Sequence, residues 1–274
     1  MTAKQPRMGG RAARHALRSA PIPPDERPVQ PGQSGGRFQP LSQSDVDRVH
    51  HAALDALETI GLANALPSQV ELFTQAGCSM SEDGRLKFPR ALVEDTVASA
   101  ARTIVLHGQE ERYDLDLSGE RVYFGTAGAA VHLVDIEKRE YRDSTISDLY
   151  DAARLVDRME HIHFFQRSMV PRDLEDPREM DFNTCYASVH GTTKHVGTSF
   201  VLPEHADESI DMLELIAGGE KLWRERPFVS CSCCFVVPPL RFAEDACRVL
   251  ETCVRRGMPI LLLAAGQAGA TSPA

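Results

Sequence analysis

Phe228-Val-Ser-Cys-Ser-Cys-Cys-Phe-Val-Val237 has the length and apolar content of a buried strand, and a helical pattern over Leu240–Arg256 follows it. A second strand-like run, Ile260–Ala264, comes after that helix. Both runs are apolar on both faces, which is typical of a sheet covered by helices. A strand, a helix and a strand in this order predict parallel strands joined by a right-handed crossover.

The same alternation extends upstream, at roughly 30–35 residues in each unit. We expect a helix from the capping-box-like Thr145-Ile-Ser-Asp148 to Met159, then a strand Ile162–Val170, a helix Pro177–Val189, a strand Lys194–Leu202 and a helix His205–Ala217. An eight-stranded barrel and a doubly wound open sheet both fit this pattern. Gly125-Thr-Ala-Gly128 follows a strand but lacks the third glycine and the following helix of a dinucleotide fingerprint. The barrel is therefore favoured.

The strand count is low for a barrel. With Val122–Phe124 as its first strand, the sequence supplies about five strands, whereas a parallel barrel needs roughly eight. The last residues, Ala265–Ala274, have the composition of a loop with no closing helix. The expected fold class is therefore α/β, a (β/α)8 TIM-type barrel truncated after about five strands, and we expect a fragment or a broken reading frame.

The first part of the chain has a different character. Residues 1–40 contain seven Pro and five Gly and predict a mobile basic arm. Residues 41–110 form the expected helical N-terminal extension, with helices beginning near Ser42, Ser68 and Pro89. Residues 111–274 then make the first part of the barrel, including a hairpin over residues 131–142.

Charge and composition exclude several classes of function. The chain carries a net charge of −9, so the acidic body predicts no binding to nucleic acid. The basic arm is expected to be a solvated tail, with contact to an anionic partner as the alternative. No apolar run approaches the ~20 residues of a membrane-spanning helix, and no export signal is visible. We expect a soluble cytoplasmic protein with reduced thiols. A mitochondrial presequence is disfavoured by the prolines near the start.

Several motifs occur in the order found in one known family. They are Tyr123-Phe-Gly-Thr-Ala-Gly128, Thr145-Ile-Ser-Asp148, Phe165 through Pro171-Arg-Asp173, Val236-Val-Pro-Pro-Leu240, Gly257-Met-Pro259 and Gly269-Ala-Thr-Ser-Pro273. Each motif alone is short, but the ordered set resembles the trimethylamine methyltransferase family over nearly the whole chain.

The resemblance implies a (β/α)8 protein that moves a methyl group from a methylated amine to the cobalt of a partner corrinoid protein, with no cofactor bound directly. Members act on trimethylamine or on quaternary amines such as glycine betaine. The pyrrolysine of the founding enzymes would lie beyond Ala274, so the catalytic residue stays unknown. A homo-oligomer is possible. The alternatives are an inactive remnant with at most an interaction role, or a different barrel enzyme that uses zinc.

Residues that face the substrate or the corrinoid are expected at the C-terminal ends of the strands. The candidates are Thr126, Gly128, Gln166, Arg167, Cys231, Cys233 and Gln267. A tight turn would also explain Thr126 and Gly128, and a structural ion pair would also explain Arg167. Lys194 and His195 fall near the start of their strand, which indicates the quieter face of the barrel.

The cysteines suggest zinc, since Cys231-Ser-Cys233-Cys234 supplies several soft ligands. Strand alternation puts Cys231 and Cys233 on one face and Cys234 on the other, so three ligands to one ion would require a bulge. We therefore expect core packing and no metal site.

Overall fold

A computed structural model describes residues 33–35, 38–264, 266 and 269. Its centre is a parallel sheet of four strands in the order β14-β11-β10-β9. The strands are β9 (Phe164–Gln166), β10 (His195–Thr198), β11 (Val229–Cys233) and β14 (Ile260–Leu262). Their spatial order follows the order of the sequence, with a helix between successive strands. The α/β class is confirmed.

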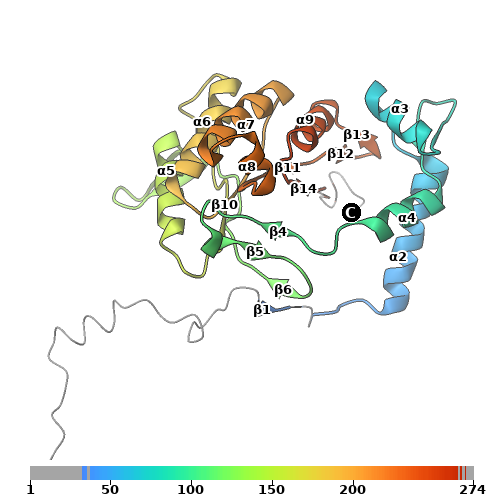
Figure 1. Cartoon of the computed structure of the whole chain (residues 1–274), viewed down its shortest axis with the longest axis horizontal. Coiled ribbons are helices and arrows are strands. Elements are labelled where there is room, and N and C mark those ends of the chain that lie inside the picture. The colour runs from blue at the N-terminus through green and yellow to red at the C-terminus, as the bar shows by residue number, and fades with distance from the viewer. Residues whose placement is uncertain (1–32, 36–37, 265, 267–268, 270–274) are drawn as a thin grey trace, which may run out of the picture.

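Helices cover one face of this sheet, as the upper part of Figure 1 shows. They are α5 (Ile146–Asp157), α6 (Pro177–Gly191), α7 (Pro203–Ala217), α8 (Glu220–Glu225) and α9 (Glu244–Arg255). The main hydrophobic core lies between the helices and the sheet; it contains Phe165, Val196, Val229, Cys231 and the sole tryptophan, Trp223. Because side chains alternate along a strand, Gln166, Gly197 and Ser232 lie on the other face.

The described residues form no closed barrel. At the β9 edge, Gly125 makes a parallel bridge to Phe164, and the His163 N–H donates to the Phe124 carbonyl at 2.7 Å. The predicted strand at residues 122–124 is only partly right, because β6 (Arg121–Val122) pairs with β1 (Gln33–Ser34) in an antiparallel ladder. The expected five strands become four strands and one bridged segment.

Between residues 41 and 110, helices begin near each of the three predicted positions. The elements of this N-terminal extension are α2 (Gln43–Asp55), the wider helical turn η2 (Ala56–Ile60), α3 (Pro67–Gln75), the hairpin of β2 (Ser79–Met80) and β3 (Leu86–Lys87), and α4 (Arg90–Ser99). Ser42 caps α2 in a capping box with Asp45, and Gly61 ends η2 at a φ of 74°. Of the predicted arm, residues 1–32, 36 and 37 lie outside the described residues.

The secondary structure predicted for residues 228–256 was partly wrong. The predicted strand to Val237 stops at Cys233, and the predicted helix from Leu240 begins at Glu244. A hairpin of β12 (Val236–Val237) and β13 (Arg241–Phe242) occupies the space between them. Contacts with the N-terminal extension hold this hairpin, since the Ala63 N–H donates to the Leu240 carbonyl at 3.0 Å. Local periodicity contains no signal for such a distant contact.

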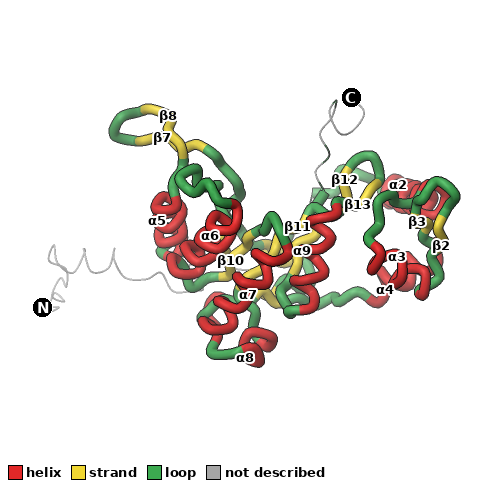
Figure 2. The backbone as a smooth tube through the Cα atoms, turned by 90° about the horizontal axis from the view of Figure 1, so that it is seen from above, coloured by secondary structure: helices red, strands yellow, loops and turns green. Residues whose placement is uncertain are grey.

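The chain between the extension and α5 forms short strands and turns. They are β4 (Val105–Leu106), the single 3₁₀ turn η3 (Glu111–Tyr113), β5 (Leu115–Asp116), β7 (His132–Asp135) and β8 (Glu140–Asp143). The predicted hairpin is confirmed as β7 and β8, which project from the rest of the molecule at the upper left of Figure 2. Within the described part of the chain, no helix is long and apolar enough to cross a bilayer.

Candidate functional site

A pocket of about 430 Å³ lies where the parallel strands end, on the face that the helices leave open. It brings together four of the predicted residues: Thr126, Gly128, Gln166 and Arg167. The other lining residues are Ala127, Ala129, Phe164, Ser199, Ser232, Leu261 and Leu263. Segments from across residues 126–263 thus converge at one place, as expected for the C-terminal edge of a parallel sheet.

The loop 126–129 forms one wall and is fastened to the end of β9. The Thr126 hydroxyl donates to the Gln166 carbonyl at 2.5 Å. A Cβ at Gly128 would lie 1.8 Å from the Arg167 carbonyl oxygen, which is far inside van der Waals contact. Glycine is therefore required at this position by a close backbone approach. A tight turn alone does not explain it.

Gln166 lies across the sheet on the open face. Its Nε2 donates to the Ser232 hydroxyl at 3.2 Å, which spans from β9 past β10 to β11. A Cβ on Gly197 would lie 1.9 Å from the Gln166 Oε1, so the small residue on β10 leaves the amide its space. In this hydrogen bond the Ser232 hydroxyl oxygen is the acceptor and the Gln166 amide is the donor.

Arg167 follows β9 and reaches a second serine. Its Nη2 donates to the Ser199 hydroxyl at 2.8 Å. Burial lowers the pKa of Arg167, and the nearby Asp181 carboxylate offsets this effect in part. Asp181 is fully buried; its Oδ2 accepts from the Val201 N–H at 2.7 Å and lies 2.8 Å from the His205 Nδ1.

The cysteines lie away from this pocket. Cys231 and Cys233 are 0% and 3% exposed and face the helices. Burial raises the pKa of Cys233 to about 12, so this thiol stays protonated at neutral pH. Contact with Cys253, together with burial, raises the pKa of Cys231 strongly. Among the described residues, no group of three His, Cys, Asp or Glu side chains is arranged to hold a metal ion.

Lys194 and His195 lie at the opposite ends of the strands, as predicted. The Lys194 Nζ donates to the carbonyls of Val156, Met159 and Ile162 at 2.6–2.7 Å. Burial lowers the pKa of Lys194 to about 8 and that of His195 to about 4. The Lys194 contacts join the start of β10 to the C-terminal end of α5 and the loop that follows it, so the role of Lys194 is structural. The last predicted site residue, Gln267, lies outside the described residues.

The sequence placed Ser199 and Ser232 at strand ends, where site residues were expected, but did not single them out as candidates, and it missed Phe164. Strand alternation contained the signal, because Ser232 lies between two cysteines that face the core. The sequence analysis chose Cys231 and Cys233 on β11, which face the core. The side chain of β11 that a ligand can reach is Ser232, on the open face of the sheet. Phe164 likewise alternates with the core residue Phe165.

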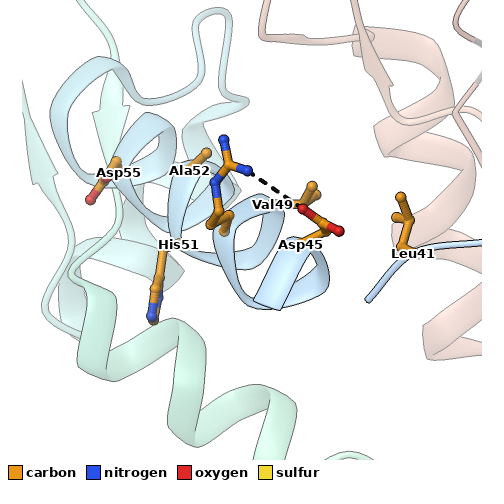
Figure 3. A pocket seen from close by; sticks show the side chains of 7 residues that line it. Leu41, Asp45, Val49, His51, Ala52 and Asp55 are labelled. Carbon is orange, nitrogen blue, oxygen red and sulfur yellow. Dashed lines mark hydrogen bonds and ion pairs between the residues drawn. The ribbon is translucent and has the colours of Figure 1, made fainter. Parts of the chain in front are cut away.

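A larger hollow, about 630 Å³, lies along α2 (Figure 3). Except for Leu41, its lining comes from one helix, and the dashed line in Figure 3 marks an ion pair between Arg48 and Asp45 at 3.5 Å. It contains no residue from the strand ends. A surface groove of this kind presents few converging groups, so the strand-end pocket is the candidate site despite its smaller volume.

Comparison with known proteins gives a consistent result. The family model described as trimethylamine methyltransferase matches residues 7–274. The trimethylamine methyltransferase MttB of Desulfitobacterium hafniense (strain DSM 10664 / DCB-2) is 31% identical over 85% of this chain and 47% of its own length. MttB2 of Methanosarcina mazei is 26% identical over 88% of the chain and 49% of its own. The glycine betaine methyltransferase of D. hafniense (strain Y51) is 23% identical over 89% of the chain and 50% of its own. The chain thus spans about half the length of these relatives.

Proposed function

Because this chain belongs to the trimethylamine methyltransferase family, we propose that its strand-end pocket binds the methylated amine from which a methyl group is removed. The observation that supports this most is the composition of the pocket. Phe164, Leu261 and Leu263 offer aromatic and apolar surface, and Gln166, Ser199 and Ser232 supply polar groups. A quaternary ammonium makes no hydrogen bonds through its methyl groups and is held by aromatic faces instead.

The proposed reaction is a displacement at a methyl carbon. The C–N bond breaks and its electron pair stays on nitrogen, and a corrinoid carried by a partner protein would supply the nucleophile that takes up the methyl group. No proton moves when a quaternary amine is the donor. The contribution of this chain would be to bind the amine, hold one methyl toward the open side of the pocket and exclude water.

The chain by itself is proposed to bind without turning over. Among the described strands the parallel sheet runs from β14 to β9, and Leu261 of the open face is 51% exposed. A barrel completed by further strands would enclose this face and the methyl donor. We place the activity in the cytoplasm, with the corrinoid protein as partner. The second candidate is an inactive remnant with at most an interaction role, which would bind no methylated amine.

A binding and turnover experiment tests this proposal. Isothermal titration with glycine betaine and with tetramethylammonium measures binding, and reduced cob(I)alamin in solution serves as the methyl acceptor, followed by its absorbance. We expect binding of at least one of these amines and no methylcobalamin. Replacing Phe164 by Leu should weaken binding by roughly 0.5–2 kcal/mol through loss of the aromatic face.

The matched control is Phe38→Leu, which alters an 88% exposed ring outside the pocket and should leave binding unchanged. If neither amine bound, the pocket would not be a methyl-donor site. If methylcobalamin formed, the chain would be catalytically sufficient, and the proposal that it only binds would be wrong.

A further inference from the structure

The exposed face of the β7–β8 hairpin is apolar. Val134 pairs with Tyr141 across the two strands, so their side chains lie on the same face, and they are 49% and 81% exposed. Ile136, in the turn, is 88% exposed. An antiparallel sheet with one face in water normally carries polar residues on that face. Here three large apolar side chains lie in water on an element that projects from the rest of the molecule (Figure 2).

The opposite face of the hairpin is turned toward the body of the molecule. Leu133 and Arg142 form the neighbouring cross-strand pair, and both are half-buried. Arg142 donates to both carboxylate oxygens of Asp148 on α5 at 2.6 Å. This ion pair fixes the orientation of the hairpin. The face that carries Val134 and Tyr141 can therefore be covered only by groups outside the described part of the chain.

The strand β8 also has a free edge. β7 and β8 form a sheet of two strands, and the outer edge of β8 has no strand partner among the described residues. The unpaired N–H and C=O groups of such an edge are a template for pairing with another chain. A two-stranded sheet of this length is only marginally stable in water, whereas three or more strands stabilise one another. Pairing of β8 with a further strand would therefore stabilise the hairpin.

The sequence of β8 is complementary to itself in one antiparallel register. With Tyr141 opposite Tyr141 of a second copy, each Glu140 lies opposite an Arg142. A shift by one residue places Glu140 opposite Asp143 or Arg139 opposite Arg142, according to its direction. A shift by two places Glu140 opposite Glu140 or Arg142 opposite Arg142. Of these five registers, only the one centred on Tyr141 brings no like charges together.

We propose that the β8 strands of two copies of this chain pair in antiparallel orientation about a twofold axis at Tyr141. The product is a four-stranded sheet in the order β7-β8-β8-β7. The two Tyr141 rings meet at its centre, and two Glu140–Arg142 pairs flank them. This interface is independent of the amine site proposed above. Four residues from each β8 bury less than the ~1,200–2,000 Å² of a stable complex, so the dimer should dissociate reversibly on dilution.

Sedimentation velocity over a range of protein concentrations tests the pairing. The whole chain carries Leu261→Glu in this experiment, so that association through the open sheet face does not contribute. Tyr141→Glu and Glu140→Lys should each raise the dissociation constant at least about tenfold, because each change acts twice across the axis. The matched control Glu137→Lys makes the same charge change in the turn of the same hairpin, outside β8, and should leave the dissociation constant unchanged. Circular dichroism verifies that each variant is folded.

Cross-linking of the chain without the Leu261 substitution gives a second measurement. Tyr141→Cys should be joined to the same position of a second copy by a short thiol-specific cross-linker, and mass spectrometry identifies the joined peptides. Six of the seven native cysteines are buried, which limits competing products. Leu215→Cys, at an 82% exposed position on α7, should give no such product.

The contrary outcomes are distinct. A chain that stays monomeric at every concentration would overturn the pairing, as would a dimer that Tyr141→Glu and Glu140→Lys leave intact. A cross-link from position 141 to another segment would show a different occupant of the β8 edge and would also overturn it.

Discussion

An added methyl group would meet different atoms at Gly128, which lines the pocket, and at Gly197 on β10, and this difference gives a prediction. A Cβ at Gly128 meets the Arg167 backbone at 1.8 Å, whereas a Cβ at Gly197 meets the far end of the Gln166 side chain at 1.9 Å. Backbone cannot swing aside, so Gly128→Ala should lower the free energy of unfolding by about 1–3 kcal/mol. Gly197→Ala should be close to neutral in stability but should break the bond from Gln166 to Ser232. Urea unfolding of both variants measures this, and equal losses would contradict it.

The lowered pKa of His195 should make the free energy of unfolding depend on pH. Its pKa is lowered from 6.5 to about 4, first by burial, so the unfolded chain binds the proton more readily. The stabilising contribution is full above pH 6.5 and is lost as pH falls toward 4. Between pH 7 and pH 4.5 the loss should be roughly 2–3 kcal/mol in the free energy of unfolding.

The control is His195→Gln, whose amide can still contact the Ser230 hydroxyl and the His107 carbonyl but does not titrate. Denaturant unfolding at the two pH values should show a smaller difference for this variant. A difference as large as that of the unmodified chain would assign the pH dependence to other groups.

Among the elements, the hairpin of β7 and β8 is fastened to α5 by one ion pair. Arg142 Nη1 and Nη2 donate to both oxygens of Asp148 at 2.6 Å, and this contact holds the pKa of Asp148 well below its usual range. Because the pKa of Asp148 is lower in the folded chain than its unfolded value of 3.8, the ionised carboxylate stabilises the fold at pH values above 3.8. This stabilisation is lost as the pH falls below 3.8. Arg142→Met should therefore raise the pH of acid unfolding. The matched control Arg154→Met, at a pair 61% and 70% exposed, should not.

The elements also show how far the sequence could predict the structure. Caps at Ser42 and Thr145 and the hairpin near residue 131 were predictable because their signals are local. The β12–β13 hairpin was not, since Ala63, far away in the chain, holds it in place. In the pocket, Gln166 and Arg167 were found from their position at a strand end. Ser199 and Ser232 also lie at predicted strand ends, and their hydrogen bonds to Arg167 and Gln166 distinguish them from their neighbours.

At the scale of the whole molecule, the open sheet face predicts self-association. Leu261 and Leu263 are 51% and 39% exposed on that face, and the outer edge of β14 has no strand partner in the described residues. The purified chain should oligomerise or bind a hydrophobic dye. Leu261→Glu should reduce both in sedimentation and fluorescence measurements. Leu215→Glu, at an 82% exposed position on α7, should not. A monomer without dye binding would contradict this prediction.

We propose that a methylated amine lies in the strand-end pocket, and its position can be observed directly. Nuclear Overhauser contacts from the methyl protons of glycine betaine to the protein, measured with ring-labelled phenylalanine and histidine, test it most directly. We expect contacts to the Phe164 ring that disappear in Phe164→Leu. Contacts to His51 in the groove along α2, with none to Phe164, would contradict the claim and place the methylated amine elsewhere.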